Sequence, residues 1–469
     1  MDFTCNYADN VIAFDKVLAP EKSFDIIKRR LVIGKNELTM YYIDGFVKDQ
    51  NMQKLMMHFI SLKGLPFGEG AAQRFVDENV PYVEVEVSSS LDAAVIAVLS
   101  GGAVLLGDCF GNEAVLIDLR TYPVRGVEEP ESDRVMRGAR DGFVETLIFN
   151  TALIRRRIRD TNLRVVYKSV GNVSKTDIAI VYLDGKADEK YVKWLEKKVS
   201  SLSVDGLPMG QQSLAESLIG KKWYNPFPKI RYTERPDTAA AQIVEGSVLL
   251  LCDTSPDAMI LPTSIFDFLQ ETGDYYFPPF TGTYLRIVRH IIFWMTLFLV
   301  PLWYLLVENP QLVPDWLTFI VPKEMGRIPL VAQIFLVEFV IDGLKLASMN
   351  TPSMLNNSLS VVGGLILGDF AVNIGWLIPE VILYMAFVAI ANFTQASYEL
   401  GYAAKFMRMM LLALTALLGV YGFVGGVVLI FALIATNSTL NRRHSYLYPL
   451  IPLNLGALAR LVFRLKKKV

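Results

Sequence analysis

Three ionisable residues lie at helical spacing inside an otherwise apolar stretch of the C-terminal half. A helix over residues 329–347 would place Glu338, Asp342 and Lys345 on one face, because they are four and three residues apart. Charges at membrane depth are costly unless they are paired or face water. Two interpretations stay open: an interfacial or re-entrant helix whose charges pair with one another, or a face that lines a water-filled ion path in an oligomer. Asp369 is open to the same two, with a structural or headgroup-level role favoured.

Two glycine pairs at four-residue spacing could let helix backbones approach closely. They are Gly364 with Gly368, and Gly422 with Gly426. In lipid, close packing must replace the hydrophobic drive between helices, and small residues permit it. Glycine is also simply common in membrane helices, but two such pairs favour tight helix packing.

No arrangement of residues suggests catalysis or metal binding. The sequence has no glycine-rich phosphate loop and no Ser-His-Asp or Cys-His arrangement. Cys5, Cys109 and Cys252 are too far apart to indicate a disulfide framework or a metal site. Asp44 and Asp184 each precede a glycine and could ligate a metal or phosphate, but turn chemistry is the favoured interpretation. We therefore expect no cofactor, no metal and no enzymatic activity.

One basic cluster, Arg155-Arg156-Arg157-Ile158-Arg159, precedes the apolar region. Apolar residues around it follow helical spacing, which predicts the solvated face of an amphipathic helix. RNA binding would need aromatic platforms beside the arginines, and none are interleaved. With a net charge of −1, we expect no nucleic-acid partner.

The first 285 residues read as a duplication. "LTMYYIDG" from Leu38 returns as "IAIVYLDG" from Ile178, and "AVLSGGAVLLGD" from Ala97 returns as "QIVEGSVLLLCD" from Gln242. β-branched and aromatic runs favour strands, and the later apolar runs are typical of strands covered on both faces. We predict an α/β cytosolic region of two duplicated strand–helix subdomains, at residues 1–140 and 141–285, joined by the Arg-rich helix.

Residues 286–440 are poor in charge and predict an α-helical polytopic membrane domain. The tail, 441–469, is basic and is expected in the cytosol by the positive-inside bias. The N-terminus lacks the pattern of a signal peptide, so both ends are expected in the cytosol and the number of crossings is even. The predicted spans are about 290–307, 356–376, 379–398 and 409–436.

Several stretches resemble the GerA family of spore germination proteins, the A subunits of germinant receptors. They are "LIRRRIRDTNLRV", "SKTDIAIVYLDGKAD", "DYYFPPFTGTYLRIVRHIIF" and the helix that carries Glu338, Asp342 and Lys345. Within the family, "SFDIIKRRLVIGKNELTMYYIDG" resembles most the branch of stage V sporulation protein AF. The resemblance implies a multi-pass protein of the spore inner membrane with its N-terminal domain facing the cytosol.

The resemblance further implies a role in an oligomeric assembly that promotes or amplifies release of monovalent cations in germination. We expect an ion channel or channel subunit that forms a homo-oligomeric ring in the lipid bilayer. Germinant receptors and a small membrane subunit are the expected partners. The alternative is a non-conducting membrane scaffold or signal relay for germinant receptors.

Overall fold

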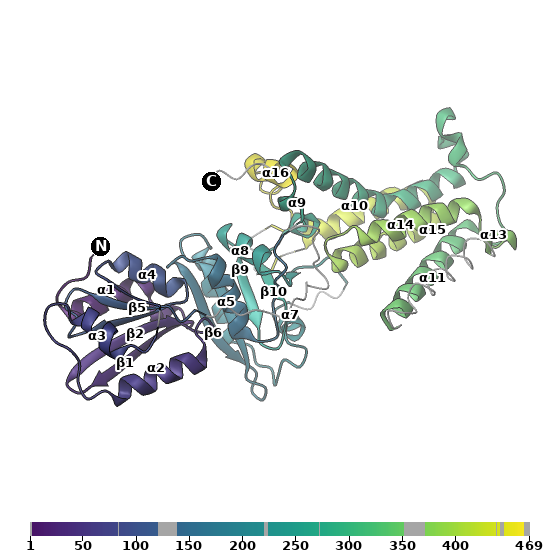
Figure 1. Ribbon diagram of the computed structural model, residues 1–469. Helices are drawn as coiled ribbons and strands as arrows, with labels where there is room; N and C mark the ends of the chain where they lie inside the picture. The colour runs from purple at the N-terminus through teal and green to yellow at the C-terminus, as the bar shows by residue number, and fades with distance from the viewer. Residues whose placement is uncertain are drawn as a thin grey trace. The chain divides into compact units, whose positions relative to one another are not determined.

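The computed structural model describes residues 2–82, 84–120, 138–219, 224–271, 273–350, 371–437, 439–440 and 445–463 (Figure 1). The chain divides into two compact units. Unit 1 comprises residues 1–220 and 230–262, and unit 2 comprises residues 221–229 and 263–469. Unit 1 holds both copies of the predicted repeat, and unit 2 holds the apolar helices.

The first copy of the repeat is a five-stranded antiparallel sheet in the order β1-β2-β4-β5-β3, with helices on both faces (Figure 1). Its elements are α1 (Tyr7–Leu18), η1 (Pro20–Lys22), β1 (Ile26–Ile33), β2 (Asn36–Ile43), α2 (Asp49–Ser61), α3 (Ala71–Asn79), β3 (Val85–Ser88), α4 (Leu91–Leu99), β4 (Ala103–Gly107) and β5 (Ala114–Ile117). Strand β4 is buried along its whole length, because α1 and α4 cover one face of the sheet and α2 and α3 cover the other.

The second copy has the same architecture, with the strand order β6-β7-β9-β10-β8. Its elements are α5 (Leu147–Arg157), β6 (Leu163–Val170), β7 (Thr176–Leu183), α6 (Glu189–Ser200), α7 (Gln211–Leu218), β8 (Arg231–Thr233), α8 (Pro236–Val244), β9 (Val248–Cys252) and β10 (Ala258–Leu261). Strand β9 is buried throughout, as β4 is. The two copies are called the first and second subdomains below.

Individual residues repeat with the fold, at a spacing of 140 by their numbers. Gly45 and Gly185 follow β2 and β7 with φ of 79° and 78°, a conformation that glycine adopts without strain. Asn10 and Asn150 accept a hydrogen bond at 2.8 Å from the backbone N–H six residues earlier. These matches align α1 with α5 and β2 with β7. Around β1 and β6 the spacing is 137 instead, because the N–H of Asp44 donates to the carbonyl oxygen of Asp25 as that of Asp184 donates to Asn162.

The Arg-rich helix, α5, is not the linker that the sequence suggested. It is the first element of the second subdomain, where α1 stands in the first, and its apolar residues lie in the second core. Ala152 of α5 packs instead in the core of the first subdomain. The helix is therefore shared by the two cores, which a sequence pattern for a single amphipathic face does not reveal.

Unit 2 is helical. Its elements are η2 (Ile265–Leu269), α9 (Gly273–Tyr276), α10 (Pro279–Glu308), η3 (Pro310–Leu312), η4 (Asp315–Ile320), α11 (Leu330–Asn350), α13 (Ala371–Asn373), α14 (Pro379–Phe393), α15 (Tyr398–Thr436) and α16 (Leu455–Val462). Helix α10 packs along α14 and α15, and α11 packs on α14 and α15 (Figure 1).

Among the described residues, two helices, α10 and α15, are long and apolar enough to cross a membrane. The predicted span at 290–307 lies inside α10. The predicted span at 379–398 corresponds to α14, which is apolar but has only 15 residues. The predicted span at 356–376 lies outside the described residues except for 371–376.

Helix α15 corrects the prediction of one straight span over 409–436. Gly419 has non-helical φ and ψ of 59° and −136°, and the chain folds back there. A Cβ at Gly426 would lie 2.5 Å from Cδ1 of Leu411, whereas those residues would be about 22 Å apart along a straight helix. The element is a hairpin with arms at 398–418 and 420–436, and composition alone does not show the reversal.

Candidate functional site

Four charged side chains meet inside unit 2, where α11 packs on the first arm of α15. Arg408 Nη2 donates to Glu338 Oε2 at 2.7 Å, and Lys405 Nζ lies 3.7 Å from Glu338 Oε1. Lys405 also donates to Asp342 Oδ2. Arg408 Nη1 donates to the carbonyl oxygen of Thr296 on α10, at 3.1 Å. We call Glu338, Asp342, Lys405 and Arg408 the charge cluster.

Burial differs across the charge cluster. Glu338, Lys405 and Arg408 are each at most 5% exposed, whereas the side chain of Asp342 is 32% exposed. Charges in such surroundings are tolerated only with close partners, because desolvation otherwise costs more than burial returns. The cluster therefore fixes α11 against α15, and Asp342 is the member that reaches toward the surface.

The structure brings together some of the predicted site residues and separates others. Glu338 and Asp342 are brought together, and both pair with cations of α15, which neither interpretation of the α11 charges had included. The Lys345 ammonium lies 5.1 Å from the ring centroid of Phe393. Asp369, Gly364 and Gly368 lie outside the described residues.

Sequence reasoning missed Lys405 and Arg408, which were placed outside the predicted spans. The available signal was their isolation: they are the only cations between residues 398 and 440 and stand three apart in an apolar sequence. Such spacing puts both cations on one helix face, which is complementary in charge to the helix face that carries Glu338 and Asp342.

The second predicted glycine pair lies between the two arms of α15. A Cβ at Gly422 would overlap the carbonyl oxygen of Leu414, and one at Gly426 would clash with Leu411. Both glycines therefore permit a close approach of helix backbones, within one chain.

Another set of buried charges lies where α9 meets the start of α10. Arg289 Nη1 donates to Asp274 Oδ2 at 2.7 Å, and Arg289 Nη2 donates to Glu271. The Arg286 guanidinium lies 3.7 Å from the same Asp274 carboxylate and 4.6 Å from the ring centroid of Tyr275. These cations, which the sequence placed just before the first span, anchor the base of α10.

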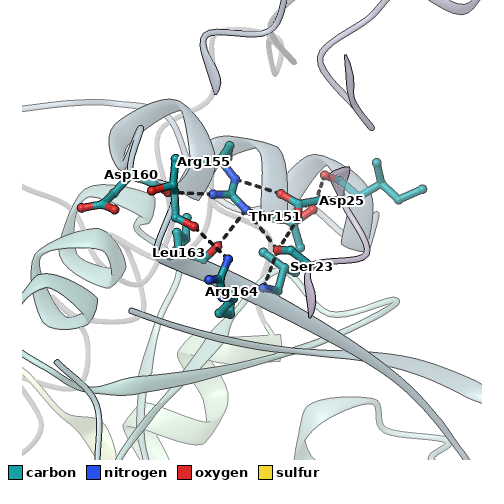
Figure 2. Close-up of polar contacts among 10 residues, drawn as sticks. Ser23, Asp25, Thr151, Arg155, Asp160, Leu163 and Arg164 are labelled. Atoms are coloured by element: carbon teal, nitrogen blue, oxygen red, sulfur yellow. Dashed lines mark hydrogen bonds and ion pairs between the residues drawn. The ribbon is translucent and has the colours of Figure 1, made fainter. Parts of the chain in front are cut away.

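Unit 1 has its own buried ion pair, at the junction of the two subdomains (Figure 2). Arg155 Nε and Nη2 donate to the two carboxylate oxygens of Asp25, at 2.9 and 3.1 Å. Nη2 also donates to Ser23 Oγ and to the carbonyl oxygen of Leu163, and Nη1 donates to that of Asp160, all at 3.2 Å. Arg155 is fully buried, so the predicted solvated face is wrong for this arginine.

Backbone contacts extend this junction. The N–H of Phe24 donates to the carbonyl oxygen of Val165 at 3.0 Å, and the N–H of Val165 donates to Ser23 Oγ at 3.0 Å. The rings of Phe24 and Tyr167 lie 5.3 Å apart. The segment before β1 thus covers the outer edge of β6.

The residues considered for catalysis and metal binding lie apart. Asp44 accepts a hydrogen bond from the N–H of Gly45 at 3.0 Å, as in turn chemistry, and burial raises its pKa. Burial also raises the pKa of the Cys109 and Cys252 thiols to about 12, which makes them poor nucleophiles. Within the described ranges, no group of three His, Cys, Asp or Glu side chains could hold a metal ion.

Comparisons with known proteins agree over most of the chain. Residues 15–469 match the model of the family described as Bacillus/Clostridium GerA spore germination protein. Stage V sporulation protein AF of Bacillus subtilis (strain 168) is 39% identical over 464 residues, which cover 98% of this chain and 93% of that protein. Spore germination protein KA of the same organism is 27% identical over 449 residues, which cover 94% and 81%.

A comparison with solved structures gives a match to about half of the chain. It is the crystal structure of the N-terminal domain of the A subunit of the Bacillus megaterium spore germinant receptor GerK3. It is 23% identical, with a TM-score of 0.41, and the match covers 55% of this chain and 96% of that one.

Proposed function

The chain belongs to the GerA family of spore germination proteins, and on that premise we propose that it is a subunit of an oligomeric ion channel in the spore inner membrane. In this proposal the channel promotes or amplifies the release of monovalent cations in germination. The chain forms a homo-oligomeric ring with unit 1 on the cytosolic side, and germinant receptors and a small membrane subunit are its partners.

The charge cluster is the observation that carries this proposal. It places two carboxylates and two cations among apolar helices, where α10 and α15 are suited to a bilayer by length and composition. Ionisable groups at membrane depth are expensive and typically mark ion or proton pathways. If stability were the only requirement, apolar side chains of similar volume would stabilise the fold equally well.

Roles within the cluster follow from burial and sharing. Glu338 is buried against both cations, so it holds them in place. Lys405 is shared between Glu338 and Asp342, and Asp342 is one-third exposed. In the proposed pore, Asp342 exchanges Lys405 for a passing cation, while Glu338 and Arg408 stay paired.

Potassium efflux from liposomes that contain the purified full-length chain tests the proposal. We expect efflux from the wild type, a lower or less cation-selective efflux from Asp342→Asn, and unchanged efflux from Glu324→Gln, which alters an exposed loop carboxylate. Liposomes with folded oligomers that stay impermeable, both alone and with a co-reconstituted small membrane subunit, would contradict it.

The second candidate is a non-conducting scaffold or signal relay for germinant receptors. The specific observation in its favour is the mutual pairing of the four charges, since a purely structural cluster needs nothing further. Under this reading the liposomes remain impermeable, and loss of Glu338 weakens the association of the chain with receptors instead.

A further inference from the structure

The junction inside unit 1 joins one face of the first subdomain to a different face of the second. Because the subdomains share one fold, each of these faces has an equivalent on the other subdomain. The turn face of the first subdomain consists of residues 23–25 and 44–45. It docks on the helix face of the second subdomain, made of α5 and the edge strand β6. At the contact, a Cβ on Gly45 would lie 2.8 Å from Ile148 Cγ2 and 3.3 Å from the Cβ of Ala152.

The equivalent turn face of the second subdomain, residues 160–162 and 184–185, is uncovered at its tip. A Cβ built on Gly185 would meet no atom within 4 Å, although its φ of 78° matches that of Gly45. The same backbone turn thus occurs twice, once packed against a helix and once with none of the described atoms within 4 Å of a Cβ at its glycine.

The equivalent helix face of the first subdomain, made of α1 and the edge strand β1, is also open. Ile12 stands on α1 where Ala152 stands on α5, 140 residues later, and its side chain is 65% exposed. Strand β1 is the terminal strand of its sheet, so its outer edge has no partner strand among the described residues.

Charge favours the meeting of these two open faces. Strand β1 carries the exposed cations Lys28, Arg29 and Arg30 in succession, of which Lys28 pairs with Asp15 and Arg30 with Glu37 in the same subdomain. The open turn face carries the acids Asp160 and Asp184, and Asp184, whose carboxylate lies 3.6 Å from Arg164 Nε, is 40% exposed. Opposite charges on two surfaces steer association and disfavour the pairing of each surface with itself.

We infer that the open turn face of one copy docks on the open helix face of a second copy, repeating between chains the contact made within the chain. This deepens the proposed function, on which it rests for the expectation that copies share one membrane. Because the two faces differ, the contact is head-to-tail, and such contacts close into a ring when the rotation permits.

The contact between copies is weaker than the internal junction. Phe24 packs on the second core, and its equivalent on the open turn face is the polar Thr161. Asn162 stands where Asp25 stands, and Asp15 stands where Arg155 stands, so the buried ion pair has no equivalent at the contact between copies. The contact between copies is therefore polar where the internal junction has a packed phenylalanine and a buried ion pair. Association then depends on the membrane, which holds the copies at a high effective concentration.

Disulfide trapping in membranes tests the inference on the full-length chain. Two tagged forms are coexpressed in a Cys5→Ser background, one with Ile12→Cys and the other with Gly185→Cys. At the internal contact the Cβ distance between Gly45 and Ala152 is 3.3 Å, a few tenths of an ångström below the range of about 3.5–4.5 Å found in disulfides, so a small shift would permit the bond. We expect adducts between the two forms and none when Met57→Cys, exposed on α2 across the first sheet, replaces Ile12→Cys.

Each other outcome overturns the inference. One such outcome is adducts that form only between identical forms, and another is an equal yield of adducts with the Met57→Cys form. A third is the absence of adducts with both Gly185→Cys and Lys186→Cys; the second of these variants reports the same face if the glycine variant fails to fold. Efflux measured on the same preparations separates the proposals. Adducts without efflux would support the docking of copies and contradict the channel. Efflux without adducts would support the channel and contradict the docking.

Discussion

Two buried ionic sites, one in each unit, are built on opposite principles. At the junction in unit 1, one guanidinium meets one carboxylate through two hydrogen bonds, and its remaining contacts go to Ser23 and to backbone carbonyls. In unit 2, Lys405 is shared by two carboxylates, and one of them, Asp342, is partly exposed. The first site is closed and the second has an open member.

In the proposed channel, this difference separates the structural role of the junction from the functional role of Asp342. A bidentate Arg–carboxylate pair is specific in geometry and, once buried, has no capacity left for another ligand. A lysine is a point charge on a flexible stem and can move between neighbouring oxygens. We expect variants at the junction to change stability, and variants at Asp342 to change function with little effect on stability.

The largest expected effect is at the junction. Arg155→Ala leaves the Asp25 carboxylate buried without its partner, which should cost about 3–5 kcal/mol of unfolding free energy for unit 1. Cys109 and Cys252 report the loss, because both thiols are buried, with pKa raised to about 12, and react with a maleimide only when their sheets open. Labelling across a urea series, in a Cys5→Ser background because Cys5 is exposed, measures the shift.

Matched variants sharpen that result. Arg156→Ala removes the neighbouring exposed arginine and should leave the urea midpoint near the wild-type value. The double variant Asp25→Leu/Arg155→Met should recover most of the lost stability, since apolar side chains can replace a buried pair. Equal labelling curves for Arg155→Ala and wild type would show that the junction is not held by this pair.

An intermediate effect is expected at Glu338. Glu338→Gln leaves Arg408 and Lys405 without their most buried anion, which should destabilise unit 2 by roughly 1.5–3 kcal/mol. The measurement is the melting temperature of the detergent-solubilised chain, with Glu324→Gln as the exposed control. A melting temperature equal to that of the control would contradict the role given to Glu338.

The smallest expected effect on stability is at Asp342. Because this carboxylate is one-third exposed, solvent screens its pairing with Lys405, and Asp342→Asn should cost less than about 1 kcal/mol. Its melting temperature should stay close to wild type while its cation efflux changes. A large fall in melting temperature with unchanged efflux would place Asp342 with the structural pairs.

Local patterns predicted the parts of the fold that local interactions determine. The strands around both Asp-Gly turns, the buried strands β4 and β9 and the first long apolar helix all follow from periodicity and composition. The pairing of Asp25 with Arg155 does not, since the partners are 130 residues apart and a run of arginines reads as a solvated face.

In unit 2, the sequence identified half of the charge cluster. Glu338 and Asp342 stood out by spacing, but their partners lie on another helix, between the predicted spans. The hairpin of α15 was missed because an uncharged sequence suits one span as well as two arms. The backbone of Gly419 and the proximity of Gly426 to Leu411 distinguish them.

The most direct measurement of the central claim is the reversal potential of the reconstituted chain under a potassium chloride gradient. We expect a cation-selective current whose reversal potential moves toward zero in Asp342→Asn and stays at the wild-type value in Glu324→Gln. Identical reversal potentials and conductance for all three proteins would contradict a pathway at the charge cluster.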